Sequence, residues 1–494
     1  MSVMDIPIAD PETVAKYEPV IGLEVHVQLK TKSKIFSGSS HEFGNPANTQ
    51  TDPVVLGLPG ALPVLNRAAV EQGVKASLAI NCRVNERSVF ARKNYFYPDL
   101  PKGYQISQFD EPLAEHGTVE IELEDGSTKT IGVTRLHLEE DAGKTVHDGF
   151  RDSNLYSYVD LNRAGAPLAE IVSEPDMRSA DEAFAYLTEL KQILEFAGVS
   201  DCDMEKGQLR CDANVSVRLK GEQKLGTKAE IKNVNSFRFA KMAIEYEIAR
   251  QVAVLEAGGA VKQETRLFNA ATGETASMRS KEEAHDYRYF PEPDLPPLIV
   301  DAKWRARIEA EMPELPRAKR KRFEDAYGLS EYDARVLSAT EAVADYFEVV
   351  AKESGDAKAA ANWVQGDLAG ALKAAELEIG ASPVSAERLA ELVKLLGDGT
   401  LSSKLAKEVF AKMFESGKTA GEIIEAEGLK QISDTGELES IIEEVIDKNP
   451  KQVEMYRGGK TTIIGYFVGQ VMKATKGQAN PQAVNEILAK KLGG

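Results

Sequence analysis

Short segments in which apolar and polar residues alternate fill roughly the first three hundred positions of the chain. Gly, Pro and Asn separate these segments, and Val119–Glu124 alternates strictly before Asp125-Gly126. Residues two apart on a strand point to the same face, and Asp-Gly is a strong signal for a tight turn between antiparallel strands. The pattern therefore predicts a largely antiparallel sheet with a hairpin at Asp125.

Helical spacing interrupts the strands at Pro63–Ile80 and at Ser179–Gly198, where Ser179 suits the N-cap and Gly198 the end of the helix. Strands and helices together predict an α+β fold. The proline-dense stretch Pro291–Pro297 then breaks the pattern and predicts a domain boundary.

Beyond the prolines, almost every segment has helical spacing. Helices are expected over Ser330–Lys352, which opens like a capping box, and over Ala357–Ala375 and Ser385–Leu396. The stretch Gly397–Thr400 breaks the pattern again and precedes a further helical unit. The predicted domains are a strand-rich catalytic cradle over 1–297, an all-helical domain over 298–400 and a small helical tail over 401–494.

Composition narrows the class of protein. The 494 residues are 43% hydrophobic and 28% charged, as in an ordinary soluble globular protein. The net charge of −18 argues against a protein that coats nucleic acid, so any RNA contact needs a local basic patch. Three cysteines, no signal-peptide layout and no apolar run near the roughly 20 residues of a membrane helix predict a cytoplasmic protein without a membrane segment.

Polar side chains share one face in each of three predicted strands. These faces carry Glu24, His26 and Gln28 in the first strand, Arg135, His137, Glu139 and Asp141 in the second, and Arg210, Asp212, Asn214, Ser216 and Arg218 in the third. The wet side of an antiparallel sheet is polar too, so solvated faces are one interpretation. The other is a metal–phosphate cradle, because His, Asp, Asn and paired Arg suit phosphate and cations such as Mg²⁺ or Mn²⁺.

Standard nucleotide motifs are missing from the sequence. Gly143-Lys144-Thr145 and Gly459-Lys460-Thr461 imitate the end of a P-loop, but Leu138 and Glu454 stand where its first Gly belongs. The chain has no G-x-G-x-x-G after a predicted strand and no G-x-S-x-G elbow. If the protein uses ATP, it binds ATP in another way.

Aromatic and basic residues mix in the segment Ala91–Tyr104. Such mixtures can stack nucleobases or the end of a tRNA. They can equally pack a proline-containing loop, and the pattern leaves both interpretations open.

Several long strings closely resemble the B subunits of bacterial tRNA-dependent amidotransferases (GatCAB), and the match runs essentially from end to end. The strings are Val20–His26, Leu56–Gly60, Arg92–Gln105, Tyr158–Arg163, Leu209–Val217 and Asp286–Pro293. The resemblance implies a first domain related in fold to glutamine synthetase, a helical domain and a tail similar to the YqeY family.

The resemblance also implies a reaction. ATP phosphorylates the side-chain carboxylate of misacylated Glu-tRNA(Gln) or Asp-tRNA(Asn), and ammonia then displaces phosphate to give Gln-tRNA or Asn-tRNA. The implied partners are the A subunit, which is an amidase and supplies ammonia through a tunnel, and the small C subunit. Two alternatives are a catalytically inert tRNA-docking scaffold and a glutamine synthetase-like ligase acting on a free small molecule.

Residue roles follow from the matched strings. Glu24, His26 and Glu139 match the family's Mg²⁺ ligands, and Lys93 and Lys102 match lysines at the tunnel mouth. The string bordering the ATP and metal pocket contains Glu205, Arg210 and Asp212. Many relatives carry a four-cysteine zinc site after the first strand. Because the corresponding positions here are Ser37, Ser39, Asp52 and Val55, no zinc is expected.

The C-terminal stretch is locally basic on an acidic chain. From Lys451 on it contains seven Lys or Arg against two Glu, and a helix is expected from Thr462 to Lys476. Backbone N–H groups at such a helix start can hold a phosphate, although a solvated helix fits the charges equally well. The resemblance to a tRNA-binding tail favours tRNA contacts by Lys460, Lys473 and Lys476.

Overall fold

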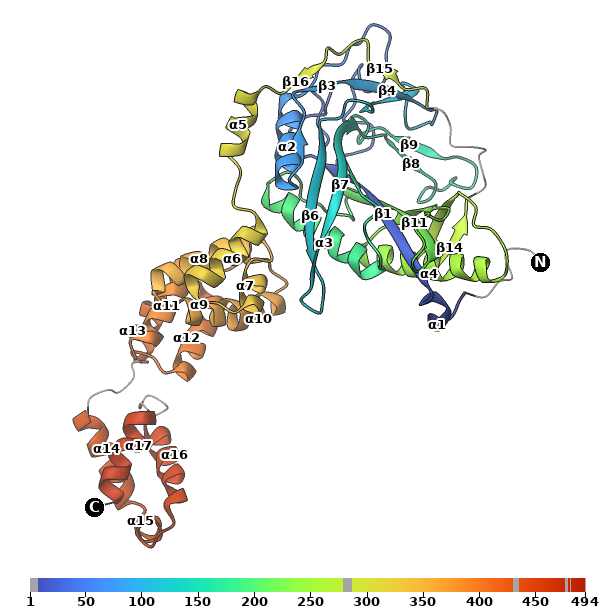
Figure 1. The fold of residues 1–494 in the computed structure, drawn as a ribbon. Helices are drawn as coiled ribbons and strands as arrows, with labels where there is room; N and C mark the ends of the chain where they lie inside the picture. The colour runs from blue at the N-terminus through green and yellow to red at the C-terminus, as the bar shows by residue number, and fades with distance from the viewer. Residues whose placement is uncertain (1–7, 279–286, 430–434, 476–478, 480, 494) are drawn as a thin grey trace. The chain divides into compact units, whose positions relative to one another are not determined.

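The computed structural model describes residues 8–278, 287–429, 435–475, 479 and 481–493 (Figure 1). The chain divides into two compact units, Met1–Leu315 and Pro316–Gly494. The first unit is mixed α+β and the second is helical, as the hydrophobic pattern predicts. The predicted boundaries near residues 297 and 400 remain predictions.

A large sheet with strand order β14-β13-β12-β11-β1-β10-β7-β6-β2 forms the centre of the first unit. Its strands are β1 (Tyr17–Gln28), β2 (Arg83–Val84), β6 (Ala114–Glu122), β7 (Thr128–Glu140), β10 (Pro167–Ser173), β11 (Leu209–Leu219), β12 (Ala229–Val234), β13 (Thr265–Asn269) and β14 (Glu274–Ser277). All neighbours in this order pair antiparallel except β12 and β13, which run parallel. The predicted hairpin joins β6 to β7, and Gly126 in its turn has a φ of +79°, which favours glycine.

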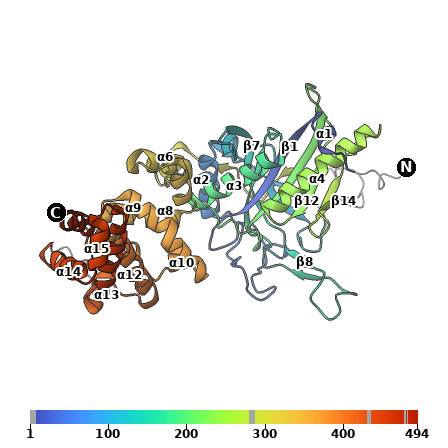
Figure 2. The same cartoon turned by 90° about the horizontal axis from the view of Figure 1, so that it is seen from below.

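Three smaller sheets accompany the large one. They are β15-β4-β5, β16-β3 and β8-β9, built from β3 (Arg87–Ser88), β4 (Phe90–Asn94), β5 (Tyr104–Gln108), β8 (Lys144–Val146), β9 (Tyr158–Asp160), β15 (Phe290–Pro291) and β16 (Leu298–Ile299). Figure 1 shows the β8–β9 hairpin and α4 (Phe237–Glu256) on opposite sides of the large sheet, and Figure 2 shows the hairpin at β8 extending away from the strands.

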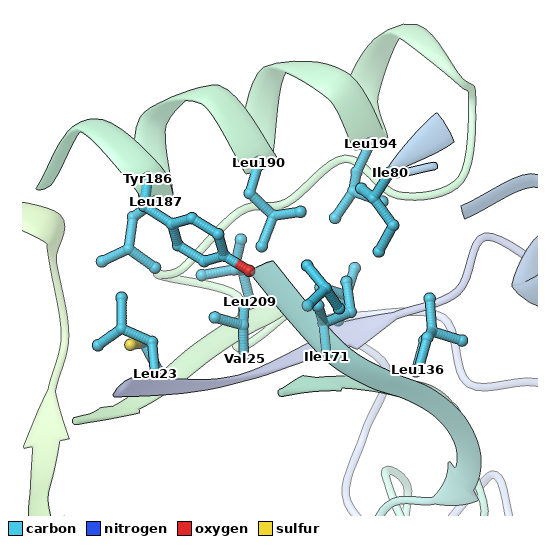
Figure 3. Packing of buried hydrophobic residues seen from close by; sticks show 14 of the residues in the cluster. Leu23, Val25, Ile80, Leu136, Ile171, Tyr186, Leu187, Leu190, Leu194 and Leu209 are labelled. Carbon is cyan, nitrogen blue, oxygen red and sulfur yellow. The ribbon is translucent and has the colours of Figure 1, made fainter. Parts of the chain in front are cut away.

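The hydrophobic core lies between the large sheet and the helices that cover one of its faces, which include α3 (Ala180–Phe196) and α4. Tyr186, Leu187, Leu190 and Leu194 project from one side of α3 toward the sheet (Figure 3). On β1 the odd positions 23, 25 and 27 are buried in this core, while the even positions 24, 26 and 28 are half-buried. The strand alternation therefore sends the polar residues of β1 to the opposite face of the sheet.

Capping side chains mark where helices of the first unit begin. The helices are α1 (Pro11–Val14), α2 (Arg67–Ala79), α3, α4 and α5 (Ala302–Ala310). The Ser179 side chain accepts from the Glu182 N–H, which confirms the predicted start of α3. The start predicted at Pro63 for α2 is wrong, because Asn66 caps that helix by accepting from the Ala68 N–H.

The second unit contains α6 (Pro316–Tyr327), α7 (Glu331–Leu337), α8 (Glu341–Ser354), α9 (Ala357–Trp363), a π-helical turn (Val364–Leu368), α10 (Ala369–Ala374), a 3₁₀ turn (Ile379–Ala381), α11 (Ala386–Gly397), α12 (Ser403–Ser416), α13 (Ala420–Glu427), α14 (Thr435–Asp447), α15 (Pro450–Arg457), a 3₁₀ turn (Thr461–Ile463), α16 (Ile464–Ala474) and α17 (Pro481–Leu492). One helix predicted over Ser330–Lys352 is in fact two, because α7 ends at Leu337 and Thr340 caps α8 by accepting from the Val343 N–H. In the described part of the chain, no helix is long and apolar enough to cross a membrane.

Two hydrophobic clusters divide the second unit. The first runs from Phe323 to Ile424 and includes Leu401 and Leu405, and the second runs from Leu438 to Leu492. The segment that follows residue 400 therefore packs with the helices that precede it. The last five helices or turns from α14 on form a separate small core.

Candidate active site

One row of polar side chains crosses four strands on the face of the sheet away from α3. His26 on β1 lies opposite Arg210 on β11 and opposite Glu170 on β10, and Glu170 lies opposite His137 on β7. Directly opposite residues of antiparallel strands have side chains on the same side of the sheet. Strand register alone therefore brings four polar residues, far apart in sequence, to one place.

His26, Glu139 and Glu170, called here the ligand group, offer donor atoms that lie within 4.8 Å of one another. The His26 Nε2 atom is 3.3 Å from Glu170 Oε2 and 3.5 Å from Glu139 Oε1. The His137 Nε2 atom is 3.2 Å from the same Glu170 oxygen. Two carboxylates and an imidazole form a donor set that suits Mg²⁺ or Mn²⁺.

Charge explains how these buried groups coexist. Burial opposes protonation of His26, but its hydrogen bond to Glu170 and the charge of Glu139 outweigh burial and raise the pKa of His26. Burial likewise opposes protonation of His137, but Glu170 raises the pKa of His137 to about 9. Burial opposes ionisation of Glu139 and Glu170, but His137 and His26 outweigh burial. The pKa of Glu139 is therefore below the usual carboxyl range, and the pKa of Glu170 is well below it. Imidazolium–carboxylate pairing thus offsets the cost of burying the carboxylates.

Hydrogen bonds from β5 orient the carboxylates of β7. The Ser107 hydroxyl donates to Glu139 Oε2 at 3.1 Å, and the Ile106 N–H donates to Glu140 Oε1 at 2.8 Å. Lys102 forms an ion pair with Glu140. Gly57 has a φ of +66° and lies so close to the Lys102 side chain that a Cβ on it would be 2.8 Å from Lys102 Cγ. A glycine is therefore required for this packing of Lys102.

Lys93 on β4 lies within electrostatic reach of the ligand group. Burial opposes protonation of Lys93, but the charges of Glu139 and Glu170 outweigh burial and raise its pKa. The Lys93 Nζ atom also lies 5.1 Å from the centre of the Tyr287 ring. Lys93 is thus a cation near two buried carboxylates.

Glu24 lies outside the ligand group, one cross-strand row away from His26. It stands opposite Asp212, and its Oε1 atom accepts a 2.9 Å hydrogen bond from Asn214. Lys232 in turn donates to Asp212 Oδ2 at 2.7 Å. Glu24, Asp212, Asn214 and Lys232 form a second polar patch on the same face.

Buried polar atoms around Asp141 have unfilled hydrogen-bonding capacity. Arg210 Nη2 is 2.8 Å from Asp141 Oδ1. Arg163 Nε lies 3.3 Å from Asp141 Oδ2, but it donates its hydrogen bond to the Ala142 carbonyl at 3.0 Å. Among the described residues, Arg210 Nε, Asp141 Oδ2 and His137 Nδ1 are buried without a hydrogen-bond partner. Because buried polar atoms are normally satisfied, these atoms fit a site that binds a polar ligand.

Of the remaining predicted site residues, Glu205 lies outside this group, and the three predicted tail lysines belong to the second unit. Glu205 is exposed in the turn before β11, where its N–H donates to Asp203. Lys460 precedes the 3₁₀ turn before α16, and Lys473 lies in the last turn of α16, both in the second unit. Lys476 lies outside the described residues.

Glu170 is the ligand-group residue that the sequence patterns did not single out. It is the only ionisable residue in β10, whose sequence is PLAEIVS. A strand that is otherwise apolar or small gives no alternating polar face to notice. One charge in such a strand is nevertheless a signal, because an unpaired buried carboxylate is costly.

The loop after β1 contains the four positions that correspond to zinc-binding cysteines in many relatives: Ser37, Ser39, Asp52 and Val55. The Ser39 hydroxyl donates to Asp52 Oδ2 at 2.5 Å, and the N–H groups of Val54 and Val55 donate to Asp52 Oδ1 at 2.8 and 2.9 Å. Ser37 and Ser39 help to lower the pKa of Asp52, against the effect of burial. Hydrogen bonds centred on one carboxylate thus hold this loop.

Known proteins resemble the whole chain. Residues 19–306 match the family model described as the GatB/GatE catalytic domain, and residues 345–492 match the model described as the GatB domain. Relatives named as the B subunit of aspartyl/glutamyl-tRNA(Asn/Gln) amidotransferase are 58% identical in Syntrophotalea carbinolica, 56% in Carboxydothermus hydrogenoformans and 57% in Geobacter sulfurreducens. Each alignment covers 97% of this chain and 99–100% of the relative.

Proposed function

The chain belongs to the family of aspartyl/glutamyl-tRNA(Asn/Gln) amidotransferase B subunits, and from this premise we propose that its ligand group is where ATP activates the side-chain carboxylate of a misacylated tRNA. The substrates are Glu-tRNA(Gln), Asp-tRNA(Asn) or both. The observation that carries the proposal is the meeting of His26, Glu139 and Glu170 within 4.8 Å on one sheet face.

The chemistry needs two steps. A carboxylate oxygen of the aminoacyl side chain attacks the γ-phosphorus of ATP, and ADP leaves with the electrons of the broken P–O bond. Ammonia then attacks the acyl carbon, and phosphate leaves with the former carboxylate oxygen, giving the amide after loss of a proton. Phosphoryl transfer of this kind depends on positioning and charge neutralisation.

The residues of the polar face fit these demands. His26, Glu139 and Glu170 would hold Mg²⁺, which when bound neutralises phosphate charge. Arg210 on the polar face and Lys93 on β4 of the smaller sheet are cations that can bind phosphate oxygens or the substrate carboxylate. Glu24, which we also propose as a Mg²⁺ ligand, and Asp212 form the adjacent polar patch, which we assign to the ATP and metal pocket. Glu205, in the turn before β11, is proposed to be a more peripheral residue of the ATP pocket.

Ammonia reaches the site from a partner. We propose that this chain assembles with the A subunit, an amidase that releases ammonia from glutamine, and with the small C subunit. Lys93 and Lys102 are proposed to border the entry of ammonia. The support is local: Lys102 pairs with Glu140, the neighbour of Glu139, and Lys93 faces Glu139 itself.

The other regions of the chain have proposed roles as well. The strand-rich cradle is proposed to be related in fold to glutamine synthetase, which also activates a carboxylate. The tail is proposed to contact the tRNA through Lys460, Lys473 and Lys476. The helices between them form the third proposed domain.

An inert docking scaffold is disfavoured, because buried carboxylates are costly and a site without chemistry has no reason to keep two of them together. ATP hydrolysis by the assembled complex, measured with and without misacylated tRNA, tests the proposal. Hydrolysis that depends on the misacylated tRNA is expected. No hydrolysis would indicate a scaffold, and stimulation by free glutamate or aspartate would indicate a ligase for small molecules.

A further inference from the structure

Exposed aromatic side chains gather at the small sheet β15-β4-β5. Phe96, Tyr97, Phe109, Tyr287 and Phe290 are all exposed, and all belong to this sheet or to the segments next to its strands. Single exposed apolar residues are ordinary on protein surfaces, but a local concentration of them indicates a binding surface.

Two of the rings in this region form a parallel stack. The Phe109 and Tyr289 ring centroids are 4.2 Å apart, and the ring planes are inclined by 7°. Tyr287 meets the edge of Tyr289 at a centroid distance of 6.1 Å. Phe109 remains 45% exposed in this stack. A planar aromatic ligand can therefore extend the stack on Phe109.

This Phe109–Tyr289 platform lies beside the ligand group. Ser107, two residues before Phe109, donates its hydroxyl hydrogen bond to Glu139. Burial raises the pKa of Tyr289, and the charges of Lys93 and Glu139 are near enough to shift this pKa as well. The platform and the buried carboxylates therefore border the same space.

Bonds from β4 fix Tyr289 in this position. Arg92 donates two hydrogen bonds to the buried Glu292, at 2.7 and 2.8 Å, and the Asn94 N–H donates to the Tyr287 carbonyl at 2.9 Å. Phe290 pairs with Arg92 in the strand register, so the segment that carries Tyr289 is tied to β4 on both sides. The platform is therefore pre-organised, which lowers the entropic cost of binding.

We propose that the Phe109–Tyr289 platform binds the 3′-terminal adenine of the misacylated tRNA. This inference rests on the proposed function. The reacting carboxylate belongs to an amino acid that is esterified to the ribose of the terminal adenosine. When that carboxylate lies at the ligand group, the adenine lies only one amino acid and one ribose away, beside the platform. Stacking on aromatic side chains is the usual way in which proteins hold an unpaired base.

Fluorescence of a tRNA that ends in 2-aminopurine riboside tests the stack directly, because stacking quenches this base. We expect the assembled complex to quench it and Phe109→Leu to abolish the quenching. Tyr289→Phe keeps both rings and should retain it. Phe184→Leu is the matched control, because Phe184 is 40% exposed on α3 and meets Phe237 at a centroid distance of 6.5 Å, outside the platform. Undiminished quenching with Phe109→Leu would overturn the proposal.

Steady-state kinetics distinguish binding of the terminal adenine of tRNA from binding of the adenine of ATP. Phe109→Leu should raise the KM for misacylated tRNA about tenfold, as expected for loss of one base stack, and leave the KM for ATP unchanged. A rise in the KM for ATP alone would assign the platform to the nucleotide and overturn the proposal.

Glutamine hydrolysis by the partner confirms assembly, and Phe109→Trp, which keeps an aromatic ring, should restore the KM for misacylated tRNA. If the native complex transamidates but these variants do not differ from it, only this inference fails; absence of native transamidation would refute the proposed function itself.

Discussion

Charge balance among single residues determines what the polar face of the sheet can bind. Glu139 and Glu170 are buried at 2% and 7% exposure, and they stay ionised because His26 and His137 lie against them. A divalent cation can take over this compensating role. Under the proposed function, this site binds a cation at the ligand group and phosphate beside it.

Loss of a ligand-group residue should abolish transamidation and spare assembly. We expect this for His26→Ala and Glu170→Gln, and for Glu24→Ala in the adjacent patch, because each removes charge stabilisation worth several kcal/mol in the transition state. Glutamine hydrolysis by the partner should survive at least in part. Glu124→Gln, at the exposed β6–β7 turn, is the control carboxylate. Native rates of amidation by His26→Ala in excess Mg²⁺ would exclude its assigned role.

Lys34 predicts a pH dependence of stability. Its side chain is fully buried, and burial lowers the pKa of Lys34 from 10.5 to about 8, although the charge of Asp52 opposes this. Folding therefore disfavours protonated Lys34. The resulting loss of folding stability is complete below pH 8 and disappears above 10.5, the pKa of Lys34 in the unfolded chain. Thermal unfolding should show the native protein gaining stability relative to Lys34→Met as pH rises from 8 to 10.5. A difference that does not change with pH would contradict the lowered pKa.

Single polar residues were predictable from the sequence where they stood in an alternating strand. Alternation identified His26 and Glu139, together with the faces of Arg210 and Asp212. It could not identify Glu170, which reaches the group only through the pairing of β10 with both β1 and β7. The register between distant strands depends on the whole sheet, and no local pattern specifies it.

Among the elements, the loop after β1 shows how hydrogen bonds can hold a long connection. Asp52 accepts from Ser39, Val54 and Val55. Asp52→Ala should lower the free energy of unfolding by about 1–3 kcal/mol, because it leaves backbone N–H groups unpaired. Ser39→Ala removes one bond and should cost less. Equal melting temperatures for the native protein and Asp52→Ala would show that other contacts hold the loop.

The same loop should contain no stoichiometric zinc. Structural zinc sites use Cys and His, whereas Ser37, Ser39 and Val55 offer no thiolate or imidazole. Elemental analysis of the purified protein should detect no tightly bound zinc. About one zinc ion per chain would overturn this expectation.

Element types could be predicted better than element ends. Caps decide the ends, and the sequence indicated Ser179 correctly because its helix follows at once. It failed at Ser338, where helical spacing continues across a break and only the second cap, Thr340, marks the new start. Short helices joined by polar caps have nearly the periodicity of one long helix.

At the scale of the whole molecule, the separate core of α14–α17 allows this last part of the predicted tail to be removed cleanly. A chain ending at residue 434 keeps the cluster from Phe323 to Ile424 intact. The complex with this shortened chain should show a higher KM for tRNA. Its ATP hydrolysis and glutamine hydrolysis should be largely retained. Replacing Lys460 and Lys473 with Ala should reduce the salt dependence of tRNA binding by about one unit of slope per lost phosphate contact. An unchanged KM and slope would place the tRNA contact elsewhere.

The central claim is that this chain's cradle passes a phosphoryl group to the carboxylate of the aminoacyl-tRNA. Transamidation by the assembled complex, with ¹⁸O in the side-chain carboxylate of Glu-tRNA(Gln) or Asp-tRNA(Asn), tests it most directly. Because phosphate leaves with a carboxylate oxygen, one ¹⁸O should appear in inorganic phosphate for each amide formed. Amide formation with unlabelled phosphate would contradict the claim.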